Sequence, residues 1–111
     1  MYSMKLKEYL YNLVADQPLY IADSNYDHRN CSTNRLEKMI TLFSDKTFIP
    51  KPVLDMEVVK FCGDTYYPGE LCDIDDEWLF DPYEDWYGCT RFYVEGFEEL
   101  KKELKLKGVV K

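Results

Sequence analysis

The beginning of the chain shows a helical apolar spacing that gives way to a strand-like run. Over residues 3–15 the apolar side chains recur three and four positions apart, which predicts an amphipathic helix. Pro18 ends this helix, and the apolar run over 19–22 predicts a buried strand. The polar stretch 23–32 that follows predicts a loop.

A second helix is expected after this loop. Asn34 and Glu37 have the spacing of an N-cap and its capping-box partner. The apolar face of this helix would consist of four side chains, Leu36, Met39, Ile40 and Phe43. The stretch 44–52, which contains two prolines, predicts another loop.

Strand periodicity begins in the middle of the chain. Apolar and acidic residues alternate over 54–58, which predicts a strand. Gly63-Asp64 predicts a turn into a partner strand at 65–67, and Pro68-Gly69 predicts a further turn.

The last third combines an irregular segment, a strand and a helix. Residues 70–88 have no clean period, apart from a single expected helical turn near 75–80. Residues 89–94 predict a strand. Three apolar side chains share one face of a last helix that ends at Gly108, namely Phe97, Leu100 and Leu104.

The predicted fold class is α+β. About three helices would pack on a small, mostly antiparallel sheet, with residues 70–88 as an irregular acidic aromatic segment. A chain of 111 residues is expected to form a single domain over 1–111. No apolar run approaches the length of a membrane span, and the N-terminus lacks a signal-peptide pattern, so we expect a cytoplasmic protein.

The charge is strongly segregated along the chain. The protein has 14 basic and 21 acidic residues and a net charge of −7. Residues 61–90 carry nine of the acids and no Lys or Arg. Tyr, Trp and Phe side chains are interleaved with these acids and could anchor them, whereas an acidic run alone would stay disordered.

One interpretation treats the acidic aromatic segment as a binding surface. Carboxylates on an aromatic scaffold can imitate DNA phosphates and enter a basic cleft of a nucleic-acid enzyme, while Tyr and Trp supply interface anchors. The alternative is a solvated acidic face that keeps the protein soluble. The predicted partner-binding residues are Asp73, Asp75, Asp76, Glu77, Trp78, Asp81, Tyr83, Glu84, Asp85 and Trp86.

The cysteines suggest a structural zinc site or free thiols, with disulfides as a third alternative. None of them forms a C-x-x-C pair, which is the usual signature of a zinc ribbon. Neighbouring turns would nevertheless allow several thiolates to converge around a zinc ion. The predicted ligands are Cys31, Cys62, Cys72 and Cys89, with His28 as an alternative fourth ligand.

Other metal chemistry and catalysis receive little support from the sequence. The D-x-D pair Asp73 and Asp75 could hold magnesium, but no glycine-rich phosphate loop accompanies it. Five acids have the ligand spacing of a calcium-binding EF-hand loop, namely Asp73, Asp75, Glu77, Asp81 and Glu84. However, Trp78 stands at the loop position that needs glycine. His28 is the only histidine, and no nucleophile and base are paired around it, so we expect no catalytic residues and no enzymatic activity.

Two stretches resemble small acidic anti-defence proteins of phages and prophages, of the anti-CRISPR type. These are MKLKEYLYNLVADQPLYIAD near the N-terminus and DIDDEWLFDPYEDWYG in the centre. The resemblance implies a stoichiometric inhibitor of a CRISPR effector nuclease, acting in the host cytoplasm by blocking DNA loading or the guide complex. The partner would be a protein with a basic nucleic-acid-binding cleft, with no direct binding to nucleic acid or membrane. The alternative is a zinc-stabilised interaction module with an unrelated protein partner.

Overall fold

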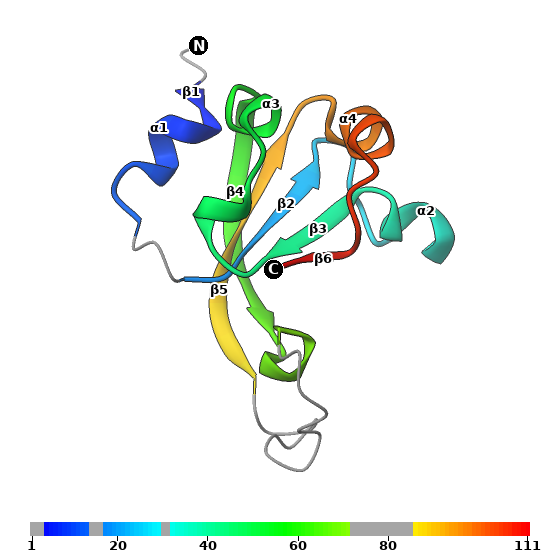
Figure 1. The fold of residues 1–111 in the computed structure, drawn as a ribbon. Coiled ribbons are helices and arrows are strands. Elements are labelled where there is room, and N and C mark those ends of the chain that lie inside the picture. Colours follow the sequence, from blue (N-terminus) through cyan, green and yellow to red (C-terminus); the bar gives the residue numbers. More distant parts are fainter. Residues whose placement is uncertain (1–3, 14–16, 30–31, 72–85) are drawn as a thin grey trace.

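A mixed sheet of six strands forms the centre of the fold (Figure 1). The computed structural model describes residues 4–13, 17–29, 32–71 and 86–111. The spatial order of the strands is β1-β4-β5-β2-β3-β6. Their bounds are β1 Met4–Lys5, β2 Leu19–Asp23, β3 Ile40–Phe43, β4 Glu57–Tyr66, β5 Tyr87–Val94 and β6 Val109–Val110.

Four short α-helices and two 3-10 turns connect the described strands. The helices α1, α3 and α4 contribute buried residues to the core, whereas α2 buries none. The bounds are α1 Leu6–Leu10, α2 Thr33–Glu37, α3 Lys51–Leu54, α4 Phe97–Leu104, η1 Lys46–Phe48 and η2 Pro68–Leu71.

The sheet combines antiparallel and parallel neighbours. β1 with β4, β4 with β5 and β2 with β3 are antiparallel. β2 with β5 and β3 with β6 are parallel. The α+β class is therefore confirmed, while the sheet has more parallel pairing, and the described chain one more helix, than the sequence predicted.

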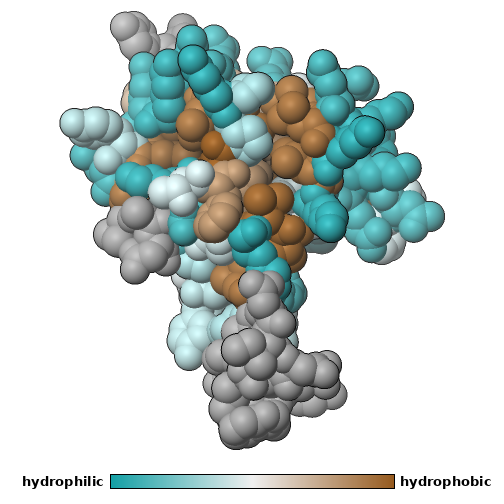
Figure 2. All heavy atoms as spheres, viewed as in Figure 1, coloured by the Kyte–Doolittle hydropathy of each residue, from teal (hydrophilic) through white to brown (hydrophobic). Residues whose placement is uncertain are grey.

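The core lies between one face of the sheet and the helices. Side chains from α1, α3 and α4 meet alternate side chains of the central strands, because successive strand residues point to opposite faces. Figure 2 shows apolar side chains gathered in the middle of the visible face, with hydrophilic ones around them. The buried cluster comprises Leu6, Leu10, Leu19, Ile21, Phe43, Ile49, Val53, Val58, Phe92, Val94 and Phe97.

Two predicted elements are wrong. The expected helix through Phe43 ends at Glu37, with Ser32 rather than Asn34 as its N-cap, and Ile40–Phe43 is a strand. Residues 41–43 are all buried, and a strand covered on both faces has no alternation from which to recognise it. The predicted Gly63-Asp64 turn is also absent, because β4 continues to Tyr66 with Gly63 paired opposite Thr90.

Other expectations are confirmed with shifted boundaries. The first predicted strand is β2, and the last predicted helix is α4, which ends at Leu104 rather than at Gly108. The strand predicted at 89–94 begins two residues earlier, at Tyr87. The strand predicted over 54–58 begins at Glu57, because Leu54 still belongs to α3. The helix predicted near 75–80 lies outside the described residues.

Candidate protein-binding site

The β4–β5 hairpin extends beyond the rest of the sheet. β4 and β5 pair from Val58 opposite Val94 as far as Tyr66 opposite Tyr87. The next strand, β2, pairs with β5 only from Thr90 onwards. The part of β5 before Thr90 and the matching part of β4 therefore form a two-stranded ribbon, which projects from the body together with η2 (Figure 1). We call this ribbon with η2, residues 64–71 and 86–89, the arm.

Aromatic pairs close the far end of the arm. The ring centroids of Tyr66 and Tyr87, which lie opposite each other, are 6.0 Å apart. The next pair, Tyr67 and Trp86, has centroids 5.9 Å apart. Tilted ring contacts of this kind stabilise a hairpin end. Trp86 and Tyr87 are still about half exposed, at 48% and 51%, so both can contact a partner.

The arm carries the flanks of the predicted binding surface. Of the predicted partner-binding residues, Trp86 is described, and the nine from Asp73 to Asp85 lie outside the described residues. Leu71 at the end of η2 and Trp86 before β5 bound that stretch, and both belong to the arm.

The described part of the chain is nearly neutral. All 14 basic residues and 13 of the 21 acidic residues fall in it. Seven of the other acids follow one another between Leu71 and Trp86 without any Lys or Arg. The excess negative charge of the protein is thus concentrated in the stretch of sequence between Leu71 and Trp86.

A half-buried ion pair fixes the strands at the base of the arm. The Arg91 guanidinium contacts the Asp64 carboxylate at 2.5 Å from Nη2 and 2.7 Å from Nε. Its Nη1 donates a hydrogen bond to the Tyr93 hydroxyl at 2.7 Å. Although burial opposes the charge of Arg91, these partners raise the pKa of the guanidinium above its usual value. Asp64, counted with the acidic run in the sequence, is therefore neutralised within the fold.

The two described cysteines lie on one face of the hairpin but not opposite each other. Cys62 is exposed in the middle of β4, opposite Arg91, and Cys89 is buried opposite Asp64. Cys62, Arg91, Asp64 and Cys89 thus form two neighbouring cross-strand pairs on this face. The two cysteines lie diagonally across these pairs, and the ion pair between Asp64 and Arg91 spans the opposite diagonal. Burial, with a smaller contribution from the Asp64 charge, raises the pKa of the Cys89 thiol to about 12, which keeps it protonated.

The predicted zinc ligands are only partly located. β4 and β5 are adjacent as the zinc hypothesis required, although Cys62 does not end its strand. Cys31 and Cys72 lie outside the described residues, and His28 lies in the loop after β2. Within the described ranges, no three His, Cys, Asp or Glu side chains are grouped as metal ligands would be.

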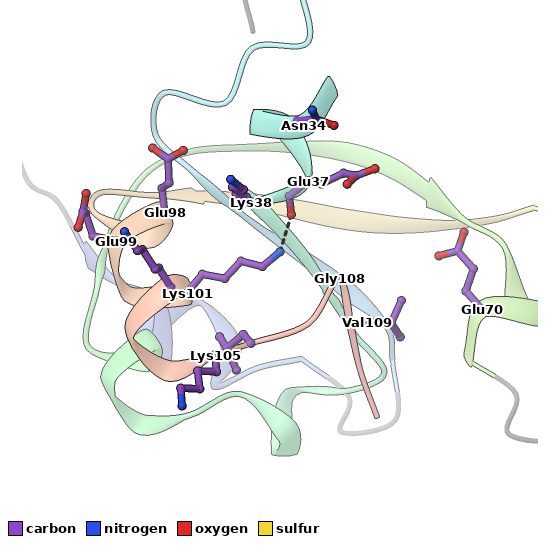
Figure 3. A pocket seen from close by; sticks show the side chains of 12 residues that line it. Asn34, Glu37, Lys38, Glu70, Glu98, Glu99, Lys101, Lys105, Gly108 and Val109 are labelled. Atoms are coloured by element: carbon purple, nitrogen blue, oxygen red, sulfur yellow. Dashed lines mark hydrogen bonds between the residues drawn. The ribbon is translucent and has the colours of Figure 1, made fainter. Parts of the chain in front are cut away.

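A groove of about 1190 Å³ lies beside α4 and is lined by charged side chains of both signs (Figure 3). Lys101 extends into it from α4 and is buried. Its Nζ donates to the backbone carbonyls of Glu37 and Ile40, both at 2.6 Å. Desolvation lowers the pKa of this amine. Because these two bonds tie α4 to the end of α2 and the start of β3, we assign Lys101 a structural role.

Comparisons with models of protein families, with curated proteins and with solved structures find no match for this chain. None of the described helices is long and apolar enough to cross a membrane.

Proposed function

We propose that the protein is a stoichiometric inhibitor of a nucleic-acid-processing enzyme, specifically a CRISPR effector nuclease. In this proposal the acidic aromatic segment occupies the basic cleft of the enzyme and blocks DNA loading. The protein performs no chemistry of its own, because its effect comes from binding alone.

The observation that supports this proposal is the separation of charge. The described residues hold 13 acidic and 14 basic side chains, whereas seven acids without a basic residue follow one another between Leu71 and Trp86. A nuclease cleft that attracts DNA phosphates attracts a dense row of carboxylates by the same electrostatic interaction. The half-exposed Trp86 and Tyr87 supply aromatic anchors beside that row.

The test measures binding of target DNA by a purified, guide-loaded CRISPR effector nuclease in the presence of increasing amounts of the protein. We expect DNA binding to be lost at a stoichiometric amount of the protein. The variant carries four neutralised acids, Asp75→Asn, Asp76→Asn, Asp81→Asn and Asp85→Asn. It should inhibit at least about tenfold more weakly, and the association rate should depend less on salt.

A matched control separates the position of the charges from their number. Four exposed glutamates of the body can be changed to glutamine with the same change in net charge, and this variant should inhibit as the wild type does. Equal inhibition by the Asp variant, or equal weakening in the control, would contradict the proposed surface. The control positions are Glu37, Glu95, Glu99 and Glu103.

The second candidate is a zinc-stabilised interaction module with another protein partner. It is favoured by the position of Cys62 and Cys89 on one face of two paired strands. Elemental analysis of protein purified without added metal should then give about one zinc per chain, and chelation should lower the melting temperature. Four titratable thiols and unchanged melting in chelator would rule this candidate out.

A further inference from the structure

A second hollow, of about 480 Å³, lies on the face of the sheet opposite the apolar core. The loop that follows β2, residues 24–29, forms one side of it. Lys60 of β4 and Arg91 and Tyr93 of β5 form the other side. Arg91 and Tyr93 alternate with the core residue Phe92, and Lys60 pairs with Tyr93, so all three point away from the core.

Three cationic side chains line this hollow. Lys60 Nζ lies 4.5 Å from the centroid of the Tyr93 ring, and neither a hydrogen bond nor an ion pair links it to a described residue. Arg29 of the loop also lines the hollow, and its guanidinium likewise has no such partner in the described chain. Arg91 is held by Asp64, with its guanidinium carbon 5.2 Å from the Tyr26 ring centroid. Among the described residues that line the hollow, only Asp27 carries a carboxylate.

The loop is anchored before any ligand arrives. The buried Asp23 carboxylate accepts hydrogen bonds from the backbone N–H groups of Asn25 and Glu98, both at 2.8 Å. The Ser24 N–H donates to the Val94 carbonyl oxygen at 2.9 Å. Because β2 and β5 also pair directly, both sides of the hollow are held by one rigid part of the sheet.

We propose that this hollow binds the phosphate group of a small phosphomonoester. A phosphomonoester carries close to two negative charges at neutral pH and three strong acceptor oxygens. Lys60 and Arg29 are available to donate charge-assisted hydrogen bonds to them, and two cations suit a dianion better than a singly charged carboxylate. The hollow exceeds the size of a phosphate group, so its Tyr26 and Tyr93 side would contact the organic part.

A small ester is a better ligand than a nucleic-acid strand. A strand would bring many phosphates towards a chain of net charge −7, whereas one phosphate meets only the local cations. The proposal uses no residue of the acidic aromatic segment and does not depend on the proposed inhibitor function.

The test titrates the protein separately with adenosine monophosphate, ribose 5-phosphate and adenosine. Binding is measured from amide chemical shifts or by calorimetry. Both phosphates should bind and adenosine should not. Lys60→Gln and Arg29→Gln should each weaken the binding of ribose 5-phosphate about tenfold, as expected for loss of a charge-assisted hydrogen bond. Lys102→Gln, an equal change in charge beside the other groove, should leave it unchanged.

Three results would overturn the proposal. The first is the absence of binding by either phosphate up to about 10 mM, a concentration at which even a weak specific site fills. The second is equal binding of adenosine and its monophosphate, because the base rather than the phosphate would then be recognised. The third is equal weakening by Lys102→Gln, because general charge screening would explain the effect. Lys60 and Arg29 are exposed, so their variants should melt as the wild type does.

Discussion

At the scale of single residues, buried polar groups join parts of the chain that are far apart in the sequence. Asp23 at the end of β2 accepts the N–H of Glu98, in the first turn of α4. That helix has no side-chain cap of its own, since Gly96 is its N-cap with a φ of 83°. Lys101 joins the same helix to Glu37 and Ile40. These hydrogen bonds between residues far apart in the sequence stabilise the packing of α4 on the sheet.

The Cys89 thiol gives a prediction about pH. Its pKa is raised in the folded protein to about 12, so folded Cys89 stays protonated at a pH where the unfolded chain loses this proton. The stability that it contributes is complete below about pH 8.5 and declines as the pH rises towards 12. We expect the free energy of unfolding to fall more steeply above pH 9 in the wild type than in Cys89→Ala, by at most about 1.4 kcal/mol per pH unit.

Urea unfolding in a reducing buffer at pH 7.5, 8.5 and 9.5 measures this difference. Cys62→Ala serves as the control for loss of a thiol, because Cys62 is exposed. Parallel pH dependence in the wild type and Cys89→Ala would contradict the prediction.

At the scale of elements, the sequence pattern predicts secondary structure well where one face of an element is buried and the other is exposed. It misleads where both faces are buried or where both are exposed. The alternating apolar face of α4 was recognised because the helix is half exposed. The buried run of β3 carries no strand period, so its spacing predicts a helix where the structure has a strand. Gly63 predicts a turn from the sequence, but a Cβ there would meet no heavy atom within 4 Å, and its place in β4 follows from pairing with β5.

The candidate sites are predictable from the sequence to different degrees, because some features are local in the sequence and others arise only from strand pairing. Acidic composition alone marks the stretch between Leu71 and Trp86 as a candidate surface. The Asp64–Arg91 pair and the hollow around Lys60 arise from strand register, and residues that are 27 or more positions apart leave no local signal.

The arm gives a prediction about local stability. Tyr66→Ala removes the ring that contacts Tyr87, and we expect a loss of about 1 kcal/mol together with faster amide exchange in residues 64–67. Tyr11→Ala is the control, because Tyr11 is 83% exposed and should be nearly neutral. Equal amide exchange in the two variants, measured by hydrogen–deuterium exchange, would show that the aromatic pair does not hold the arm.

At the scale of the whole molecule, the hydrophobic core and the excess negative charge come from different parts of the chain. The described core is drawn from residues up to Val58 and from Phe92 onwards. The excess of acidic residues lies between these two regions of sequence, mostly between Leu71 and Trp86. Because none of the described core residues lies between these limits, the body should tolerate the loss of the acidic stretch.

The last prediction removes that stretch. Replacing residues 67–86 with Asn-Gly joins the paired Tyr66 and Tyr87 by a two-residue turn. The change deletes eight acidic and no basic residues, so the net charge rises from −7 to +1. We expect the shortened protein to fold and to melt within about 8 °C of the wild type, since the lost Tyr67–Trp86 contact is worth about 1 kcal/mol.

Two binding measurements on the shortened protein then separate the two proposals. Inhibition of the nuclease should be lost, because the carboxylates that we propose to occupy its cleft are gone. Ribose 5-phosphate should still bind with unchanged affinity, because Lys60, Arg29 and Arg91 all remain. Retained inhibition would refute the acidic surface, and loss of phosphate binding in a folded shortened protein would refute the separate hollow. A shortened chain that fails to fold would show instead that the arm is part of the folding unit, because the body would then depend on contacts beyond its own core.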